Sequence, residues 1–235
     1  MRTEREPRRL VIAIDGPVGA GKSTAARLLA ERLGCRYIDS GAMYRALAWK
    51  ALHAGLDLDD EPNLRRLLDA TSITLERSGD RPLVLVDGQE VGRQMRNPEV
   101  EQASSKISTL AGIRRVMVAR QREMAGQGRV VMDGRDIGTV VFPDADIKFY
   151  LEAPLEERAR RRYLEARSAG VEGTLEEFTE DVKVRDARDM GRSASPLRKA
   201  DDAVTIDTTD LNPFQVVDRM ENAINRRVGL LEGST

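Results

Sequence analysis

The sequence has few of the features that mark secreted or membrane-spanning proteins. Its 235 residues include a single cysteine, Cys35, which cannot form an internal disulfide, and no apolar run reaches the 18 residues that a membrane helix needs. The first ten residues, MRTEREPRRL, are too charged for a signal peptide, so we expect a cytoplasmic protein. The one histidine, His53, lies in an apolar stretch without a relay partner, which predicts a packing or surface role rather than catalysis.

Strong charge of one sign is also missing. The chain has 38 basic and 39 acidic residues and a formal net charge of -1, which argues against a polybasic surface for a nucleic-acid polymer or a membrane. Arginine outnumbers lysine 32 to 6, but a coding bias would give the same skew, so only arginines at defined positions are informative. The hydrophobic content of 40% supports one globular core, with room for an inserted subdomain.

Apolar strands alternate with helical segments along most of the chain. Short runs rich in β-branched residues predict strands at 9–15, 35–39, 129–133, 147–153 and 203–207. Helical spacing predicts helices at 23–34, at 41–55 and from about Pro213 onward. This alternation predicts an α/β fold with a parallel central sheet.

The pattern changes in the middle of the chain. ITLERS and PLVLVDGQEV flank the turn-like pair Gly79-Asp80 and predict an antiparallel hairpin. A helical stretch over 98–128, broken near Gly112, then leads back to the sheet at Arg129. We therefore expect one chain, 1–235, whose core comprises 10–58 and 129–228 and whose insertion covers about 59–128.

The motif GPVGAGKST lies between the first predicted strand and the first predicted helix. It fits the phosphate-loop pattern G-x-x-x-x-G-K-[ST], in which backbone N–H groups and a helix N-terminus surround a phosphate. The lysine of such a loop reaches the β- and γ-phosphates, and the serine hydroxyl can bind Mg²⁺. We predict a nucleotide-phosphate site formed by Gly16, Pro17, Val18, Gly19, Ala20, Gly21, Lys22, Ser23 and Thr24.

Two further motifs follow the ends of predicted strands, where ligands of open α/β sheets gather. In DSGAMYR, Ser40 and Arg45 open a helix, and Arg45 suits a second phosphate; the alternative is a helix cap at Ser40 with a solvated arginine. In VVMDGRD, Asp133 ends a strand next to the phosphate loop, where an acid can lie near Mg²⁺.

Two arginine-rich segments remain. In PLEERARRRYLEARSAG, Arg158, Arg161 and Arg162 share one helical face and Arg160 points elsewhere. In VKVRDARDMGR, the predicted shared face consists of Arg185, Arg188, Asp189 and Arg192. The alternative for both segments is a solvated face with internal Glu–Arg pairs.

GPVGAGKST, DSGAMYR, DGRDIGTVVFPDA and RDARDMGR together resemble the motifs of bacterial cytidylate kinases, from about residue 10 to residue 228. The resemblance implies transfer of the γ-phosphoryl of ATP to CMP or dCMP with Mg²⁺. It also implies a P-loop three-layer core, an inserted monophosphate-binding domain and a helical lid near 155–192.

The resemblance further implies a set of site residues. The expected substrate site comprises Ser40, Arg45, Ser105, Arg114, Arg135, Asp136, Arg185, Asp189 and Arg192, with Ser104 and Arg115 as alternatives to Ser105 and Arg114. The expected catalytic residues are Lys22, Arg135, Arg158, Arg162 and Arg185, and the expected metal ligands are Ser23 and Asp133.

The chemistry of this set suits cytosine. Asp136 can accept from the exocyclic amine, whereas uracil would present a carbonyl there, which disfavours UMP by on the order of a few kcal/mol. Guanidinium groups such as Arg45 and Arg135 suit the phosphate. Two alternatives stay open: a kinase of another small metabolite, such as shikimate or gluconate, and a nucleotide-binding module without chemistry. A GTP switch is disfavoured because no Asn/Thr-Lys-x-Asp element is present, and the default oligomeric state is a monomer.

Overall fold

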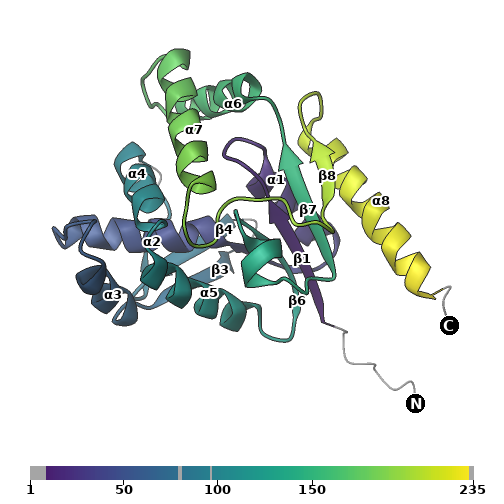
Figure 1. Ribbon diagram of the computed structural model, residues 1–235, viewed down its shortest axis with the longest axis horizontal. Helices are drawn as coiled ribbons and strands as arrows, with labels where there is room; N and C mark the ends of the chain where they lie inside the picture. Colours follow the sequence, from purple (N-terminus) through teal and green to yellow (C-terminus); the bar gives the residue numbers. More distant parts are fainter. Residues whose placement is uncertain (1–8, 79–80, 96, 233–235) are drawn as a thin grey trace. The chain divides into compact units, whose positions relative to one another are not determined.

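The computed structural model describes residues 9–78, 81–95 and 97–232 (Figure 1). The chain divides into two compact units. The first unit comprises residues 1–37, 125–191 and 195–235, and the second comprises 38–124 and 192–194. The second unit thus begins inside the second strand and includes the helix over 40–53, which we expected in the core. We describe each unit separately.

A five-stranded sheet forms the centre of the first unit. Its strand order is β2 (Arg36–Asp39), β6 (Arg129–Asp133), β1 (Leu10–Asp15), β7 (Ile147–Glu152) and β8 (Val204–Asp207). β1 runs parallel to β6 and β7, and β7 runs parallel to β8, as the sequence predicts. The central strands β1, β6 and β7 are mostly buried, because parallel sheets are covered on both faces, whereas the edge strands β2 and β8 bury one residue each.

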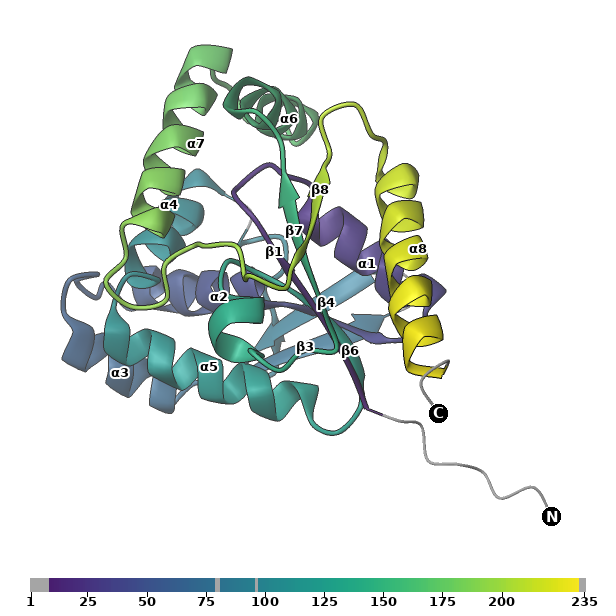
Figure 2. The ribbon, with the colours of Figure 1, turned by 45° about the vertical axis from the view of Figure 1, so that its right-hand side comes forward.

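Helices α1 (Lys22–Arg32) and α8 (Pro213–Glu232) pack next to each other against this sheet (Figure 2). Leu29 of α1 and Met220 of α8 are fully buried with Ile12 and Phe149 from the strands. Burying each such side chain contributes about 1.5–3 kcal/mol to folding. This core fixes the start of α1 relative to the end of β1.

α6 (Leu155–Ser168) and α7 (Leu175–Met190) form a helical hairpin after β7 (Figure 1). Thr174 begins α7 with a capping box, in which its side chain accepts from the Glu177 N–H and Glu177 accepts in return. α7 ends at Met190, so the prediction that Arg192 shares a helical face with Asp189 is wrong. Gly191 follows Met190, and glycine is about 1 kcal/mol less favourable than alanine inside a helix.

A π-helical turn, η1 (Ile137–Val141), joins β6 to β7 and was not predicted from the sequence. The Phe142 N–H donates to the Ile137 carbonyl at 2.7 Å, and the Val141 N–H donates to the Asp136 carbonyl at 3.1 Å. Both bonds span five residues. Such turns are rare and frequently lie at functional sites.

The second unit contains a three-stranded antiparallel sheet, β3 (Ile73–Ser78), β4 (Arg81–Val86) and β5 (Gln89–Glu90). This confirms the predicted hairpin, whose turn at Gly79-Asp80 lies outside the described residues. Its helices are α2 (Ser40–His53), α3 (Glu61–Asp69), α4 (Pro98–Ile107) and α5 (Ala111–Ala125). α3 was not predicted, and the helical break falls at 108–110, whereas Gly112 lies inside α5.

The core of the second unit forms between its helices and its hairpin. Met43 and Leu47 of α2 are fully buried with Met117 of α5, and Val86 of β4 joins them. His53 is exposed, packs its ring against Trp49 at 4.4 Å and places Nδ1 2.8 Å from the Trp49 carbonyl oxygen, in keeping with the predicted packing or surface role. Among the described residues, no helix is long and apolar enough to span a membrane.

Candidate active site

The phosphate loop connects β1 to α1, and two of its glycines are required by close contacts. Gly16 has φ +147°, and a Cβ there would lie 2.1 Å from the Leu151 carbonyl oxygen. Gly19 has φ +76°, and a Cβ there would lie 2.7 Å from the carbonyl oxygen of Arg158. The loop therefore passes directly against β7 and α6, which only glycine permits. No side chain caps the N-terminus of α1, so its first N–H groups can bind an anion.

Lys22 is the buried cation of this loop. The residue is 5% exposed, and its Nζ donates to the Pro17 carbonyl at 2.6 Å. Burial, followed by the positive charge of Arg135, lowers the pKa of Lys22 to about 7, against the opposing effects of Asp133, Asp189 and Asp15. An arriving phosphate would favour the charged ammonium form, because an opposite charge nearby raises the pKa of an amine.

Asp133 lies next to the loop, as the sequence predicts. Its carboxylate accepts from the Ser23 hydroxyl at 2.8 Å and from the Tyr37 hydroxyl at 2.8 Å. A serine hydroxyl and a carboxylate are hard oxygen ligands that fit Mg²⁺, which proteins usually hold with one or two carboxylates plus substrate phosphates. The described residues contain no cluster of three or more His, Cys, Asp or Glu that could hold a metal by itself. Tyr37 was missed by the sequence analysis, since a tyrosine in a predicted strand carries no specific signal.

Four predicted substrate residues lie in the first unit. Arg135 donates from Nε to Asp189 at 2.8 Å, and its Nη1 donates to the Gly134 carbonyl at 3.2 Å. Asp136 is 5% exposed and immediately precedes η1. Arg185 lies one helical turn before Asp189 on α7, 3.7 Å from Asp181. Arg135 is thus hydrogen-bonded to Asp189, and its positive charge also lowers the pKa of Lys22.

Asp15 is a buried carboxylate that the sequence analysis did not single out. It accepts from the N–H groups of Ile137 at 2.8 Å and Gly138 at 2.7 Å. Burial raises its pKa to about 6 although these two hydrogen bonds act in the opposite direction. Asp15 therefore holds the start of η1, directly after Arg135 and Asp136. The available signal was an acid at the end of a buried strand, just before Gly16.

Three other predicted substrate residues meet in the second unit. The Arg192 guanidinium donates to the Ser108 hydroxyl at 2.7 Å, and that hydroxyl donates to the Ser105 carbonyl at 2.8 Å. Arg114 donates to the Ser108 carbonyl at 3.1 Å. Ser105, Arg114 and Arg192 are all buried, whereas Arg115 is exposed, which favours Arg114 over its alternative. Ser108 links the set and was missed, because serines are common in such segments.

Arg45 and Ser40 lie at the start of α2. Asp39 caps this helix by accepting from the Ala42 N–H at 2.9 Å, so the alternative of a cap at Ser40 is wrong. The second oxygen of Asp39 accepts from Arg45 at 2.7 Å. Ser40 is buried at the first helical position.

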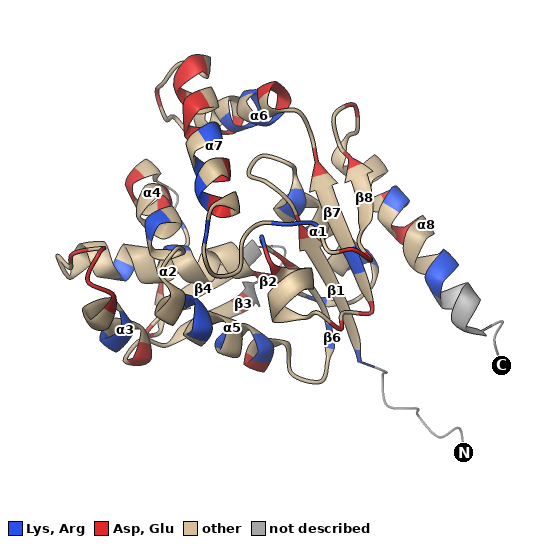
Figure 3. Cartoon of the chain, in the orientation of Figure 1, with Lys and Arg blue, Asp and Glu red and all other residues tan. Residues whose placement is uncertain are grey.

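The arginines of α6 have different surroundings, and Figure 3 shows acidic and basic residues alternating along α6 and α7. Arg160 and Arg161 bind Glu157, and Arg162 binds Glu165 at 2.9 Å. These are the internal Glu–Arg pairs expected if α6 has a solvated, charged face. Arg158 differs because it is buried and bonded to the phosphate loop. The helix therefore combines Glu–Arg pairs with a buried arginine, Arg158, that contacts the phosphate loop.

A glycine-rich turn between a parallel strand and a helix, with a buried lysine and a strand-end carboxylate, places the chain among P-loop nucleotide-binding α/β proteins. Residues 12–226 match the family model described as Cytidylate kinase, and the chain belongs to this family. It is 50% identical over 222 residues to the cytidylate kinase of Geobacillus kaustophilus (strain HTA426), covering 94% of this chain and 99% of the relative. It is 46% identical over 219 residues to that of Geobacter sp. (strain M21), covering 93% and 94%.

A solved structure has a similar fold. The gluconokinase from Sinorhizobium meliloti 1021 superimposes with a TM-score of 0.51 at 13% sequence identity, and the comparison covers 98% of this chain and 99% of that one. At this identity the likeness concerns the fold alone.

Proposed function

We propose that the protein transfers the γ-phosphoryl group of ATP to CMP or dCMP, giving ADP and CDP or dCDP. The observation that carries the proposal is the position of Arg135. It lowers the pKa of Lys22, the lysine of the donor loop, and it is bonded to Asp189, a residue expected on the acceptor side. Arg135 therefore affects the lysine of the donor site and is hydrogen-bonded to a residue of the expected acceptor site. Family membership over residues 12–226 supports the same activity.

On the donor side, the loop from Gly16 to Thr24 binds the ATP phosphates through its backbone N–H groups and Lys22. Ser23 and Asp133 would hold Mg²⁺, which neutralises phosphate charge when bound. The Ser23–Asp133 bond at 2.8 Å supports this assignment, because it brings the two oxygen ligands together.

On the acceptor side, Asp136 accepts from the cytosine amine, and Ser105 and Arg114 bind the ring acceptors. The phosphate of CMP is bound by the arginines, and Asp189 fixes those arginines or binds the pentose hydroxyls. The proposed acceptor residues are Ser40, Arg45, Ser105, Arg114, Arg135, Asp136, Arg185, Asp189 and Arg192. The burial of Asp136 supports a base-reading role, because a desolvated carboxylate discriminates strongly between a donor and an acceptor.

Catalysis rests on alignment and charge neutralisation, since phosphoryl transfer needs little covalent help from a protein. We assign no general base. Lys22, Arg135, Arg162 and Arg185 neutralise charge on the transferring group. α6 and α7 cover the expected lid segment, and their closure would exclude water and suppress ATP hydrolysis. Arg158 stays a predicted catalytic residue; its guanidinium donates to the Val18 and Ala153 carbonyls and to Asp186.

An ADP-release assay across CMP, dCMP, UMP, AMP, shikimate and gluconate tests the proposal. We expect CMP and dCMP to react far faster than the others. Activity only with shikimate or gluconate would identify a different metabolite kinase, and tight ATP binding without any turnover would identify a binding module. Asp136→Asn should reduce the preference for CMP over UMP by about tenfold or more, as expected when a buried polar reader changes. An unchanged preference would remove Asp136 from base recognition.

The cytoplasmic location and the monomeric state remain predictions from the sequence. Gel filtration with light scattering at assay concentrations would test the second of these.

A further inference from the structure

The backbone of Val18, in the middle of the phosphate loop, is bonded to both helices of the α6–α7 hairpin. Its carbonyl accepts from Arg158 Nη1 at 3.0 Å, and its N–H donates to Asp186 Oδ1 with an N···O distance of 3.4 Å. Arg158 and Asp186 are joined to each other at 2.6 Å. An arginine from α6 and an aspartate from α7 therefore hold the same loop residue.

This ion pair is buried, since the side chains of Arg158 and Asp186 are 9% and 10% exposed. Arg158 also donates from Nε to the Ala153 carbonyl at 2.9 Å. A buried ion pair contributes little net stability compared with apolar residues of similar size, because both charges must be desolvated. Stability alone is thus a weak reason for two charges at this point, whereas their directed bonds to the loop specify its shape.

Two apolar contacts bring the same loop against the helices. The Val18 side chain packs in a small buried cluster with Ala159 of α6 and Val182 of α7. Gly19 lies so close to α6 that an added Cβ would be 2.9 Å from the Cβ of Arg158. The loop is therefore fixed by packing as well as by hydrogen bonds.

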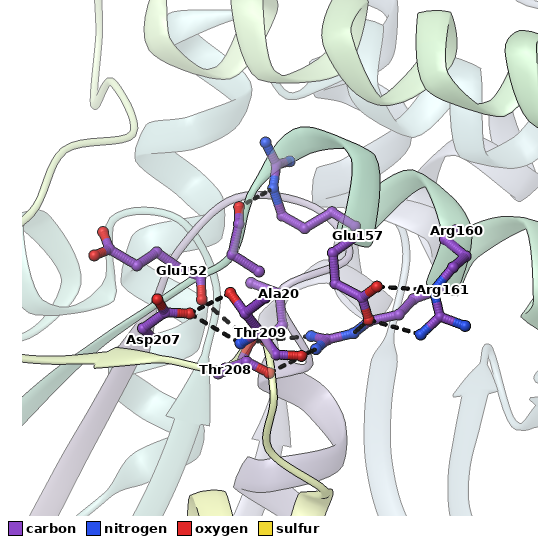
Figure 4. Close-up of polar contacts among 10 residues, drawn as sticks. Ala20, Glu152, Glu157, Arg160, Arg161, Asp207, Thr208 and Thr209 are labelled. Carbon is purple, nitrogen blue, oxygen red and sulfur yellow. Dashed lines mark hydrogen bonds and ion pairs between the residues drawn. The ribbon is translucent and has the colours of Figure 1, made fainter.

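A second arginine of α6 supports the loop at Ala20 through Thr208 (Figure 4). Arg161 donates to the hydroxyl and the carbonyl of Thr208 at 3.0 and 2.6 Å. The Thr208 hydroxyl in turn lies 3.3 Å from the Ala20 carbonyl. The two arginines thus support the loop at Val18 directly and at Ala20 through Thr208.

We propose that Arg158 and Asp186 are positioning residues for the phosphate loop, and that they couple donor binding to α7. A glycine-rich loop must otherwise lose conformational freedom when it binds phosphate, and a loop held in advance binds more tightly. Asp186 lies directly after Arg185 and three residues before Asp189, both assigned to the acceptor. A change in the contact between Val18 and Asp186 on donor binding is therefore transmitted to the acceptor side of α7. The coupling rests on the proposed function, but the positioning of the loop does not.

The test uses a double variant, Arg158→Met with Asp186→Leu. Changing one partner alone would leave a buried, unpaired charge and could unfold the hairpin, whereas replacing both with apolar residues often preserves stability. Arg160→Met is the matched control. Arg160 lies on the same helix, is 56% exposed and pairs with Glu157 on the surface.

Calorimetric titration with magnesium and a non-hydrolysable ATP analogue measures donor affinity, and CMP titration with and without the analogue measures coupling. The double variant should bind the analogue about tenfold more weakly, as expected when a pre-organised loop is released. In the parent and in Arg160→Met, the analogue should change CMP affinity about fivefold or more, and in the double variant less than about twofold. Thermal denaturation without ligands shows whether the double variant remains folded.

A folded double variant with the parent's donor affinity would overturn the positioning role. Weaker donor binding with unchanged coupling, or a parent without coupling, would overturn the link to α7. If the double variant does not fold, Arg158→Lys replaces it, because lysine keeps the charge beside Asp186 but lacks the forked geometry that reaches Val18 and Ala153. Its expected donor affinity lies below the parent's, and parent-like affinity would contradict the proposal.

Absence of CMP turnover in the parent would reject the proposed function, while donor affinity still decides the positioning role.

Discussion

The phosphate loop follows β1 and the η1 turn follows the neighbouring strand β6, yet different forces shape them. The loop has a local signal, its glycines and the N-terminus of α1, although Arg158 and Asp186 also hold it. The η1 turn depends on residues distant in the sequence, since Asp15 binds its first N–H groups. A buried lysine follows each turn and donates to a proline carbonyl at 2.6 Å: Lys22, at the start of α1, to Pro17, and Lys148, in β7, to Pro143. We therefore expect the first turn to bind substrate phosphate, whereas Asp15 fixes the second turn directly after Arg135 and Asp136.

The two lysines give the largest expected contrast. Lys22→Met should lower kcat by about 100-fold or more, because it removes a charge that stabilises the transferring phosphoryl group. Lys148→Met should instead cost about 1–3 kcal/mol of folding stability by leaving the Pro143 carbonyl without its buried donor. Steady-state kinetics and urea denaturation of both variants check this. Equal kinetic losses would end the distinction between the two turns.

The pH dependence of stability isolates Asp15. Its pKa is raised from 3.8 to about 6, so the folded state binds more protons than the unfolded state between these values, and stability falls as pH rises through them. Relative to the parent, Asp15→Asn should therefore gain up to about 3 kcal/mol between pH 4 and 6.5. The lowered pKa of Lys22 acts in a separate window, above about pH 7, where stability rises with pH. Urea denaturation across pH 4–7 measures the free energy of unfolding of Asp15→Asn and of the parent. If the difference between the two does not change with pH, the pKa of Asp15 is not raised.

Substitutions of glycine test how locally the phosphate loop is determined. Gly16→Ala forces a Cβ toward the Leu151 carbonyl and should destabilise the fold by about 1–3 kcal/mol beyond the conformational cost, as overpacking does. Gly21→Ala is the matched control, because Gly21 also has positive φ, +83°, but an added Cβ there meets nothing within 4 Å. Thermal denaturation of both variants should rank Gly16→Ala as the less stable. The reverse order would mean that backbone conformation alone requires the glycines.

The smallest expected effect concerns the acceptor. Asp15→Asn leaves one of the η1 N–H groups without an acceptor oxygen, so we expect KM for CMP to rise about tenfold with little change in KM for ATP. Asp146→Asn is the control, because Asp146 accepts from the Val11 N–H at 2.7 Å near the opposite end of β1. Steady-state kinetics with each substrate varied in turn separates the two KM values. Parallel changes in both would indicate a general loss of structure.

Much of the fold could be predicted because its signals are local. The β-branched runs and glycine-bounded helices of 9–54 predicted β1, α1, β2 and α2 closely, and the hairpin over 73–91 was found as well. η1 could not be found, since its IGTVV sequence has no helical period and its N–H groups are bound by Asp15. The burial of Arg158 could not be predicted either. A helical pattern shows which residues share a face, but it does not show that the phosphate loop covers that face at Arg158.

The sequence by itself determined the phosphate loop, the parallel sheet and the family motifs, since these depend on residue types at fixed spacing. Only the tertiary structure decided which of the many arginines are inside. It paired Arg135 with Asp189, directed Arg114 and Arg192 toward Ser108, and buried Arg158 against Val18. The physical reason is desolvation. A guanidinium can leave water only where oppositely charged or hydrogen-bonding groups from distant segments meet it, and that meeting is a property of the folded chain.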